Sequence, residues 1–135
     1  ALKRPLSSMT PVIVFSDGEP WFATGSPGGA RIITAVLQMV VNMIDHGMNI
    51  ADASHRPRIH HQWFPDKLTI EVGFGADTIQ LLEERGHTLD VRGSLGTSLQ
   101  TVAYKDGLFR GASDPRRPNS GAAAPRPALD AAANE

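Results

Sequence analysis

The chain has 135 residues, 41% of them hydrophobic, and a formal net charge of -1 at pH 7. This length suits one domain with a modest core, and the balanced charge gives no reason to expect a nucleic acid or an anionic membrane as partner. The lack of cysteine excludes a disulfide framework, and no apolar run is long enough to span a bilayer. No secretory signal is visible and the first residue is Ala1, so we expect a processed or internal piece of a longer protein.

The first predicted elements are a hairpin and a long helix. The apolar β-branched run 12–15 predicts a strand, the Asp-Gly pair at 17–18 a tight turn, and residues 21–24 the returning strand. Apolar residues recur at helical spacing over 30–46, and they cover so much of the circumference that this helix belongs to the core. Gly47 is the expected stop.

The middle of the chain predicts a second, shorter helix and an irregular loop. Asn49 is a good cap for a helix that runs through Ser54 and ends before Pro57. Residues 55–66 read as a loop without regular structure, and 68–72 as a strand.

The last predicted elements are an amphipathic helix, a short strand and a second hairpin, at 76–85, 88–91 and 98–110. In the helix, Ile79, Leu81 and Leu82 are expected to face inward. The element order indicates an α+β fold with helices packed on an antiparallel sheet. We expect residues 1–117 to form the folded portion and the Pro/Ala-rich residues 118–135 a flexible tail. We also expect the first hairpin to gain a partner sheet from outside this chain.

The junction between the first hairpin and the long helix is the most informative chemical feature. Gly28 and Gly29 stand where a helix begins, so their backbone N–H groups lack intrahelical acceptors and the helix dipole adds partial positive charge. Such a turn can bind an anion or a developing oxyanion. The alternative is a tight turn that merely needs glycine. No Lys-Ser/Thr pair follows, which disfavours a phosphate loop.

Two serines just before the first strand form a second candidate site. The hydroxyls and amides of Ser7 and Ser8 could bind a carboxylate. The alternative is a polar loop that leads into the strand. No general base is near in sequence, so neither serine reads as a nucleophile.

Two other polar clusters favour structural interpretations. Adjacent His60 and His61 point in different directions and lack partners at recognised ligand spacing, so a hydrogen-bonded loop is favoured over a metal site. The charged stretch 114–117 could be an ion-paired turn, but a solvated charged loop is favoured.

Five segments occur along roughly residues 3–117, at 4–11 (RPLSSMTP), 25–33 (GSPGGARII), 49–53 (NIADA), 57–63 (PRIHHQW) and 111–116 (GASDPR). Taken together and in this order, they resemble the γ-glutamyltransferase (γ-glutamyltranspeptidase) family. The resemblance implies the C-terminal part of the small, catalytic subunit of an N-terminal-nucleophile hydrolase, an αββα sandwich completed by a large subunit. It implies a precursor that cleaves itself, and a periplasmic or secreted location.

The resemblance also implies chemistry. A threonine at the new N-terminus attacks the γ-glutamyl carbonyl of a donor such as glutathione, and the acyl-enzyme passes the glutamyl group to water or to an amino acid or peptide. It assigns the oxyanion hole to the N–H groups of Gly28 and Gly29, and the donor's α-carboxylate to Ser7 and Ser8. No metal and no cofactor are implied.

The nucleophile itself is expected to be absent from this chain, because the family's threonine lies upstream of the Ser-Ser motif. Thr10, Thr24 and Thr34 do not occupy its place. Activity is therefore expected only after assembly with the large subunit and the upstream segment of the small subunit. Two alternatives stay open: a related glutaryl or cephalosporin acylase on the same scaffold, and a non-catalytic assembly fragment.

Overall fold

The computed structural model describes residue 3 and residues 11–123. A four-stranded antiparallel sheet with the order β1-β2-β6-β7 contains both hairpins. Its strands are β1 (Val12–Ser16), β2 (Glu19–Gly25), β6 (Gln100–Lys105) and β7 (Leu108–Ser113). The predicted hairpins are confirmed, and β7 continues three residues beyond its expected end.

Both hairpins close through Asp-Gly pairs in the left-handed backbone region. Asp17 and Gly18 have φ of 52° and 85°, and Asp106 and Gly107 have φ of 55° and 75°. Two successive positive φ values define the turn whose twist matches that of the flanking strands. The sequence therefore specified each reversal locally.

The first hairpin pairs with the second hairpin inside this chain, and the expected partner sheet from outside the chain stays a prediction. Strand β2 pairs with β6, and Phe22 lies opposite Ala103. Sequence patterns could not show this pairing, because the two strands are separated by most of the folded chain.

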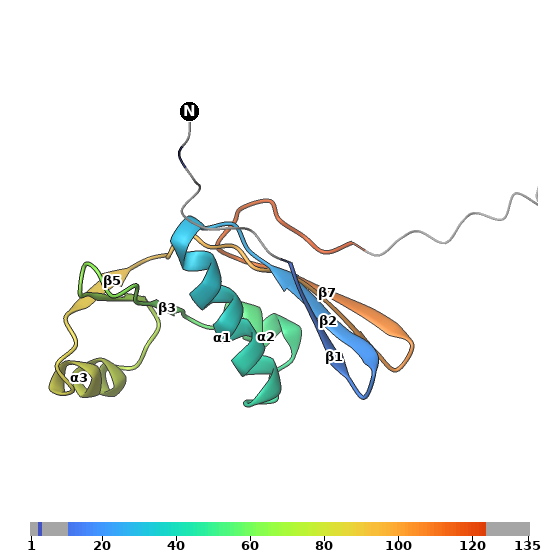
Figure 1. Cartoon of the computed structure of the whole chain (residues 1–135), viewed down its shortest axis with the longest axis horizontal. Coiled ribbons are helices and arrows are strands. Elements are labelled where there is room, and N and C mark those ends of the chain that lie inside the picture. Colours follow the sequence, from blue (N-terminus) through green and yellow to red (C-terminus); the bar gives the residue numbers. More distant parts are fainter. Residues whose placement is uncertain (1–2, 4–10, 124–135) are drawn as a thin grey trace, which may run out of the picture.

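The long helix begins later than predicted. A 3-10 turn, η1 (Gly29–Arg31), leads into α1 (Ile32–Ile44). The helix ends at Ile44 and not at the predicted His46, and Gly47 provides the expected stop just beyond it: its φ is 62°, and the N–H of Met48 donates to the Asn42 carbonyl at 3.0 Å. Helix α1 lies between the four-stranded sheet and the smaller sheet with α3 (Figure 1).

The core forms where α1 and the short helix α2 (Ile50–His55) pack on one face of the four-stranded sheet. The buried residues of this core are Phe22, Ile32, Val36, Met39, Met43, Ile50, Ala53, Leu99, Ala103 and Ala112. Figure 1 shows both helices on the same side of the sheet. The two helices thus cover one face of the sheet.

The smaller sheet contains an element that the sequence did not predict. It has the order β3-β4-β5, with β3 (Ile59–His60), β4 (Leu68–Glu71) and β5 (Leu89–Arg92). Strand β3 lies in the expected loop and is too short for a periodic signal. Strands β4 and β5 are parallel, because α3 (Ala76–Glu84) connects them as a crossover.

Helix α3 is less buried than its pattern predicted. Ile79 and Leu82 are half-buried, but Leu81 is 46% exposed, so the expectation that all three face inward was wrong for Leu81. Ile79 and Leu82 are three residues apart and therefore share one face of the helix, whereas Leu81 lies on a different face.

The proposed division of the chain at residue 117 stays a prediction. Part of the proposed tail lies outside the described residues, but Ser120 is hydrogen-bonded: its hydroxyl donates to the carbonyls of Asp114 and Arg117, both at 3.0 Å. Among the described residues, no helix is both long and apolar enough to cross a membrane.

The cap of α2 gives a direct test of the local structure. The Asn49 side-chain oxygen accepts from the N–H groups of Ala51 and Asp52 at 3.0 and 2.9 Å. Asn49→Ala should lower the free energy of unfolding by about 1 kcal/mol. Asn49→Ser should lower it by much less, because a serine side chain can also cap the helix. Urea unfolding measures both, and equal losses in the two variants would contradict the capping role.

Candidate functional site

The Gly28–Gly29 turn follows β2 and leads directly into η1 and α1. Gly28 has a φ of 143° and Gly29 a φ of 57°, so both need a backbone that other residues rarely adopt. Neither N–H donates a hydrogen bond to any other described residue, and Gly29 is exposed. Two free donors at the start of a helix can stabilise negative charge, so the geometry is compatible with the predicted oxyanion role.

A buried network of four charged side chains, joined by three ion pairs, lies near this turn. Asp114 is fully buried, and its Oδ2 accepts from Arg58 Nη2 at 2.6 Å. Its Oδ1 accepts from Arg116 Nη1 at 3.1 Å. Arg116 Nε also donates to both oxygens of Glu71, at 2.9 and 2.8 Å. The preference for a solvated charged loop at 114–117 was therefore wrong.

Each charge in the network has further partners, as buried charges require. Arg58 Nη2 and Arg116 Nη1 both donate to the Ser54 carbonyl, at 2.7 and 3.1 Å. Arg58 Nη1 donates to the hydroxyl of Thr97 at 3.0 Å. Sequence reasoning missed Arg58, Glu71 and Thr97. The available signal for Glu71 was a carboxylate that ends an apolar strand.

The protonation of Asp114 follows from these contacts. Burial alone would raise the pKa of its carboxyl, but the N–H groups of Arg116 and Leu99 and the guanidinium of Arg58 stabilise the anion and hold the pKa below the ordinary 3.8. Burial lowers the pKa of Arg58, yet arginine starts so high that it stays charged. The network is therefore ionic at neutral pH.

The two adjacent histidines are held in separate hydrogen bonds. His60 is buried, with Nδ1 2.8 Å from Thr34 Oγ1 and Nε2 3.1 Å from Gln62 Oε1. His61 Nε2 lies 3.0 Å from the Asp66 carboxylate. Within residue 3 and residues 11–123, no three metal-ligating side chains converge. These hydrogen bonds agree with a structural role for the two side chains, with His60 on β3 and His61 directly after it.

The second predicted site is the serine pair that precedes the first strand. Ser7 and Ser8 lie outside the described residues, so their relation to the glycine turn stays a prediction.

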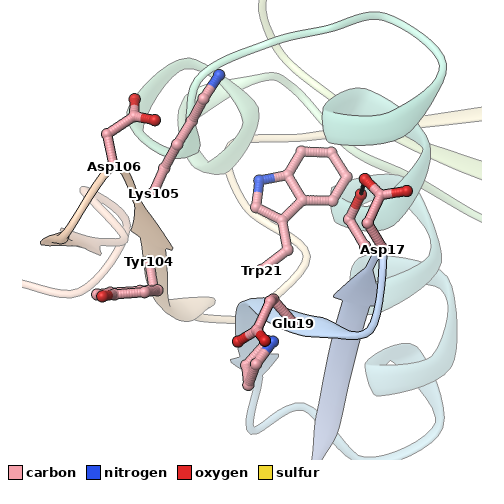
Figure 2. A pocket seen from close by; sticks show the side chains of 8 residues that line it. Asp17, Glu19, Trp21, Tyr104, Lys105 and Asp106 are labelled. Carbon is pink, nitrogen blue, oxygen red and sulfur yellow. Dashed lines mark hydrogen bonds between the residues drawn. The ribbon is translucent and has the colours of Figure 1, made fainter.

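A separate hollow lies at the opposite end of the four-stranded sheet, between the two hairpin turns. It is lined by Asp17, Glu19, Trp21 and Tyr104, among others, and Figure 2 shows carboxylates on either side of the indole ring. Strand β2 runs from this hollow at Glu19 toward the glycine turn. No residue predicted for chemistry lines it.

The fold and sequence together define the class of protein. The structure superposes on the γ-glutamyltranspeptidase of Helicobacter pylori with a TM-score of 0.79 and 42% identity, covering 87% of this chain and 65% of that chain. It also resembles a cephalosporin acylase from Bacillus halodurans, with a TM-score of 0.72 and 25% identity over 78% of this chain and 20% of that chain. The four-stranded sheet and its helices are thus part of an N-terminal-nucleophile hydrolase fold.

The family follows from the sequence match. The profile of the γ-glutamyltranspeptidase family matches residues 1–124. The glutathione hydrolase proenzyme of Escherichia coli is 55% identical over 114 residues, which cover 84% of this chain and 20% of that protein. The chain belongs to the γ-glutamyltranspeptidase family. It spans about a fifth of the length of the curated relatives it matches.

Breaking the ion network should be costly. Asp114→Asn removes the charge that compensates Arg58, so the free energy of unfolding at pH 7 should fall by about 3–5 kcal/mol. The exposed pair of His61 and Asp66 provides a matched control, and Asp66→Asn should cost less than about 1 kcal/mol. Chemical denaturation measures both, and similar losses would contradict a special role for the buried network.

The same variant tests the pH dependence. The folded state lowers the pKa of the Asp114 carboxyl. Its ionised form therefore contributes fully to the free energy of unfolding above the ordinary pKa of 3.8, and this contribution is lost as the pH falls through the lower folded-state pKa. Stability should therefore decline in acid less steeply for Asp114→Asn than for the unaltered protein. Parallel acid-unfolding curves would count against this assignment.

Proposed function

We propose that this chain is the C-terminal part of the small subunit of a γ-glutamyltransferase that cleaves γ-glutamyl amides such as glutathione. The observation that carries the proposal is the Gly28–Gly29 turn in a chain of this family, because the two N–H groups lie at a helix start and donate to no residue that the structure describes. A relative of the chain is named a glutathione hydrolase proenzyme, which supports glutathione as a donor.

The reaction needs a nucleophile from another segment. A threonine hydroxyl there attacks the γ-carbonyl and its own α-amino group takes the proton. The carbonyl oxygen becomes an oxyanion, which the N–H groups of Gly28 and Gly29 stabilise before the C–N bond breaks and the amine leaves with a proton. Water or an amine then attacks the acyl-threonine ester, so the glutamyl group is released or transferred.

The partners we propose are the large subunit and the upstream segment of the small subunit. Two exposed apolar surfaces support this. The outer side of α1 presents Ile33, Leu37 and Ile44, which recur at helical spacing. The face of the four-stranded sheet away from α1 presents Ile13 and Val102 among other apolar residues. Uncovered apolar surface on both sides is typical of a part that packs inside a larger assembly.

The assembled protein gives the decisive assay. This chain, combined with the large subunit and the upstream segment, should release the chromophore from a γ-glutamyl anilide. A correctly assembled complex without that activity would reject the proposal and favour a non-catalytic assembly fragment. We also propose a periplasmic or secreted location, which cell fractionation would test.

The likeness to a cephalosporin acylase keeps a glutaryl amidase as the second candidate. Glutaryl and γ-glutamyl groups differ only in the α-amino group when both keep the terminal carboxylate. A higher kcat/KM for glutaryl than for γ-glutamyl amides would favour the acylase. The 55% identity to a glutathione hydrolase proenzyme favours the γ-glutamyl donor.

Removing one oxyanion donor should slow turnover. Exchange of Gly29 for glycolic acid replaces its N–H by an ester oxygen without changing the shape of the turn. The kcat should fall roughly 10²–10³-fold, as for other oxyanion donors, with a smaller effect on KM. Proline is unsuitable, because its φ near -65° cannot match the 57° of Gly29.

Gly29→Ala is the matched control for that exchange. Its N–H remains, and a Cβ at this position would meet no atom within 4 Å. The variant should keep most of the kcat despite modest strain from its positive φ. Similar turnover in the ester and alanine variants would remove Gly29 from the oxyanion site.

The serine pair should govern the donor and not the acceptor. Replacement of Ser7 and Ser8 together with alanine should raise KM for γ-glutamyl donors, because their hydroxyls would no longer bind the α-carboxylate. Acceptor preference should change little. The measurement compares donors with and without an α-carboxylate, and equal losses toward both would contradict the assignment.

A further inference from the structure

The glycine turn is crossed by a distant loop, residues 94–99, which we call the crossing loop. Both of its ends are held by the buried carboxylates of the ion network. The N–H of Leu95 donates to Glu71 Oε1 at 2.9 Å, and the N–H of Leu99 donates to Asp114 Oδ2 at 2.8 Å. The position of this loop therefore depends on the network.

The crossing loop is tied to the segment around the glycine turn on either side. The N–H of Ser98 donates to the hydroxyl of Ser26 at 2.9 Å, just before the turn. Arg31 Nη1 donates to the Leu95 carbonyl at 2.8 Å, just after the turn. Between these two ties, the loop and the turn face each other.

Thr97 makes the closest approach. A Cβ built on Gly28 would lie 2.7 Å from the methyl carbon of Thr97, and 3.5 Å from both its Cα and its Cβ. The threonine methyl therefore occupies the space that a side chain at position 28 would need. Thr97 is 2% exposed, so it cannot move aside into solvent.

This approach matters because glycine has no intrinsic preference for the observed backbone. Gly28 has a φ of 143°, and an unconstrained glycine would exchange among several regions. A neighbouring group must therefore limit it if its N–H is to keep one direction. The Thr97 side chain is suited to this, because β-branching restricts its rotamers and Arg58 Nη1 holds its hydroxyl at 3.0 Å.

We propose that Thr97 is the positioning residue of the oxyanion turn. Its hydroxyl is anchored to the ion network through Arg58, and its methyl group holds Gly28 in the conformation that aims the backbone N–H groups at the reacting oxygen. This role deepens the proposed function and rests on it. Thr97 does not touch the substrate, and it acts only through the glycine backbone.

Two substitutions separate the parts of this side chain. Thr97→Ser keeps the hydroxyl and removes the methyl, so the turn should loosen and kcat should fall about tenfold, a fraction of the loss of a whole oxyanion donor. Thr97→Val keeps the shape and removes the hydroxyl, so it should lower the stability and leave kcat within about threefold. The control is Thr101→Ser, a buried threonine whose hydroxyl lies 2.8 Å from that of Thr24.

The assembled enzyme is tested with two inhibitors. A glutamate analogue whose γ-carboxyl is replaced by a boronic acid forms a tetrahedral adduct with the nucleophile, whereas free L-glutamate binds with a planar carboxyl. Thr97→Ser should weaken the boronate about tenfold and leave glutamate unchanged, because only the adduct needs aligned oxyanion donors. Equal weakening of both inhibitors, or a kcat equal to that of Thr101→Ser, would overturn the proposal.

A measurement without substrate keeps this proposal separate from the proposed function. The N–H of Arg31 donates to the Gly28 carbonyl at 3.2 Å, so its hydrogen exchange reports the order of the turn. Exchange should be about tenfold faster in Thr97→Ser than in Thr101→Ser or the unaltered protein. If the assembled protein lacks γ-glutamyl activity, the proposed function fails, and faster exchange would still support the hold on the turn. Unchanged exchange would reject the role of Thr97 whatever the activity.

Discussion

The need to neutralise buried charge governs this structure. Asp114 is fully buried and Arg58 is 2% exposed, so each would be strongly destabilising without the other. Arg116 and Glu71 complete the set. Because these four groups come from the segment between α2 and β3, from β4 and from the segment after β7, the charges join the two sheets. The two carboxylates also accept hydrogen bonds from backbone N–H groups of the crossing loop, and these bonds fix the position of the loop.

The glycine turn depends on the ion network indirectly, through the crossing loop. The absence of side chains at positions 28 and 29 allows the backbone of the turn to adopt this conformation, but it does not hold the backbone there. Restraint comes from the surroundings: helix α1 behind it, Ser98 bound to Ser26 before it, and Thr97 packed against it. Preorganised donors are effective because they need no rearrangement when charge develops. The packed interior therefore has to hold the turn in place if its N–H groups are to stabilise an oxyanion.

Local signals in the sequence predicted the local structure well. The Asp-Gly pairs, the Asn49 cap and the Gly47 stop each act through neighbouring atoms, and all are confirmed. The pairing of β2 with β6, the parallel pairing of β4 with β5 and the buried ion pairs join distant segments, so no local pattern contained them. The charged stretch 114–117 was misjudged for this reason: its partners, Arg58 and Glu71, lie 56 and 45 residues away. The site assignments themselves came from family resemblance and from helix-start chemistry.

The sequence distance between the turn and its anchors also has a temporal consequence. The glycine turn is synthesised before Asp114 and Arg116, which hold the crossing loop and Arg58. A nascent chain can thus form the hairpin and α1 while the donors at the turn remain unaligned. On the proposed role of Thr97, the donors align once Arg58 has its carboxylate partner, so the ion network links the turn to residues that are made later in the chain.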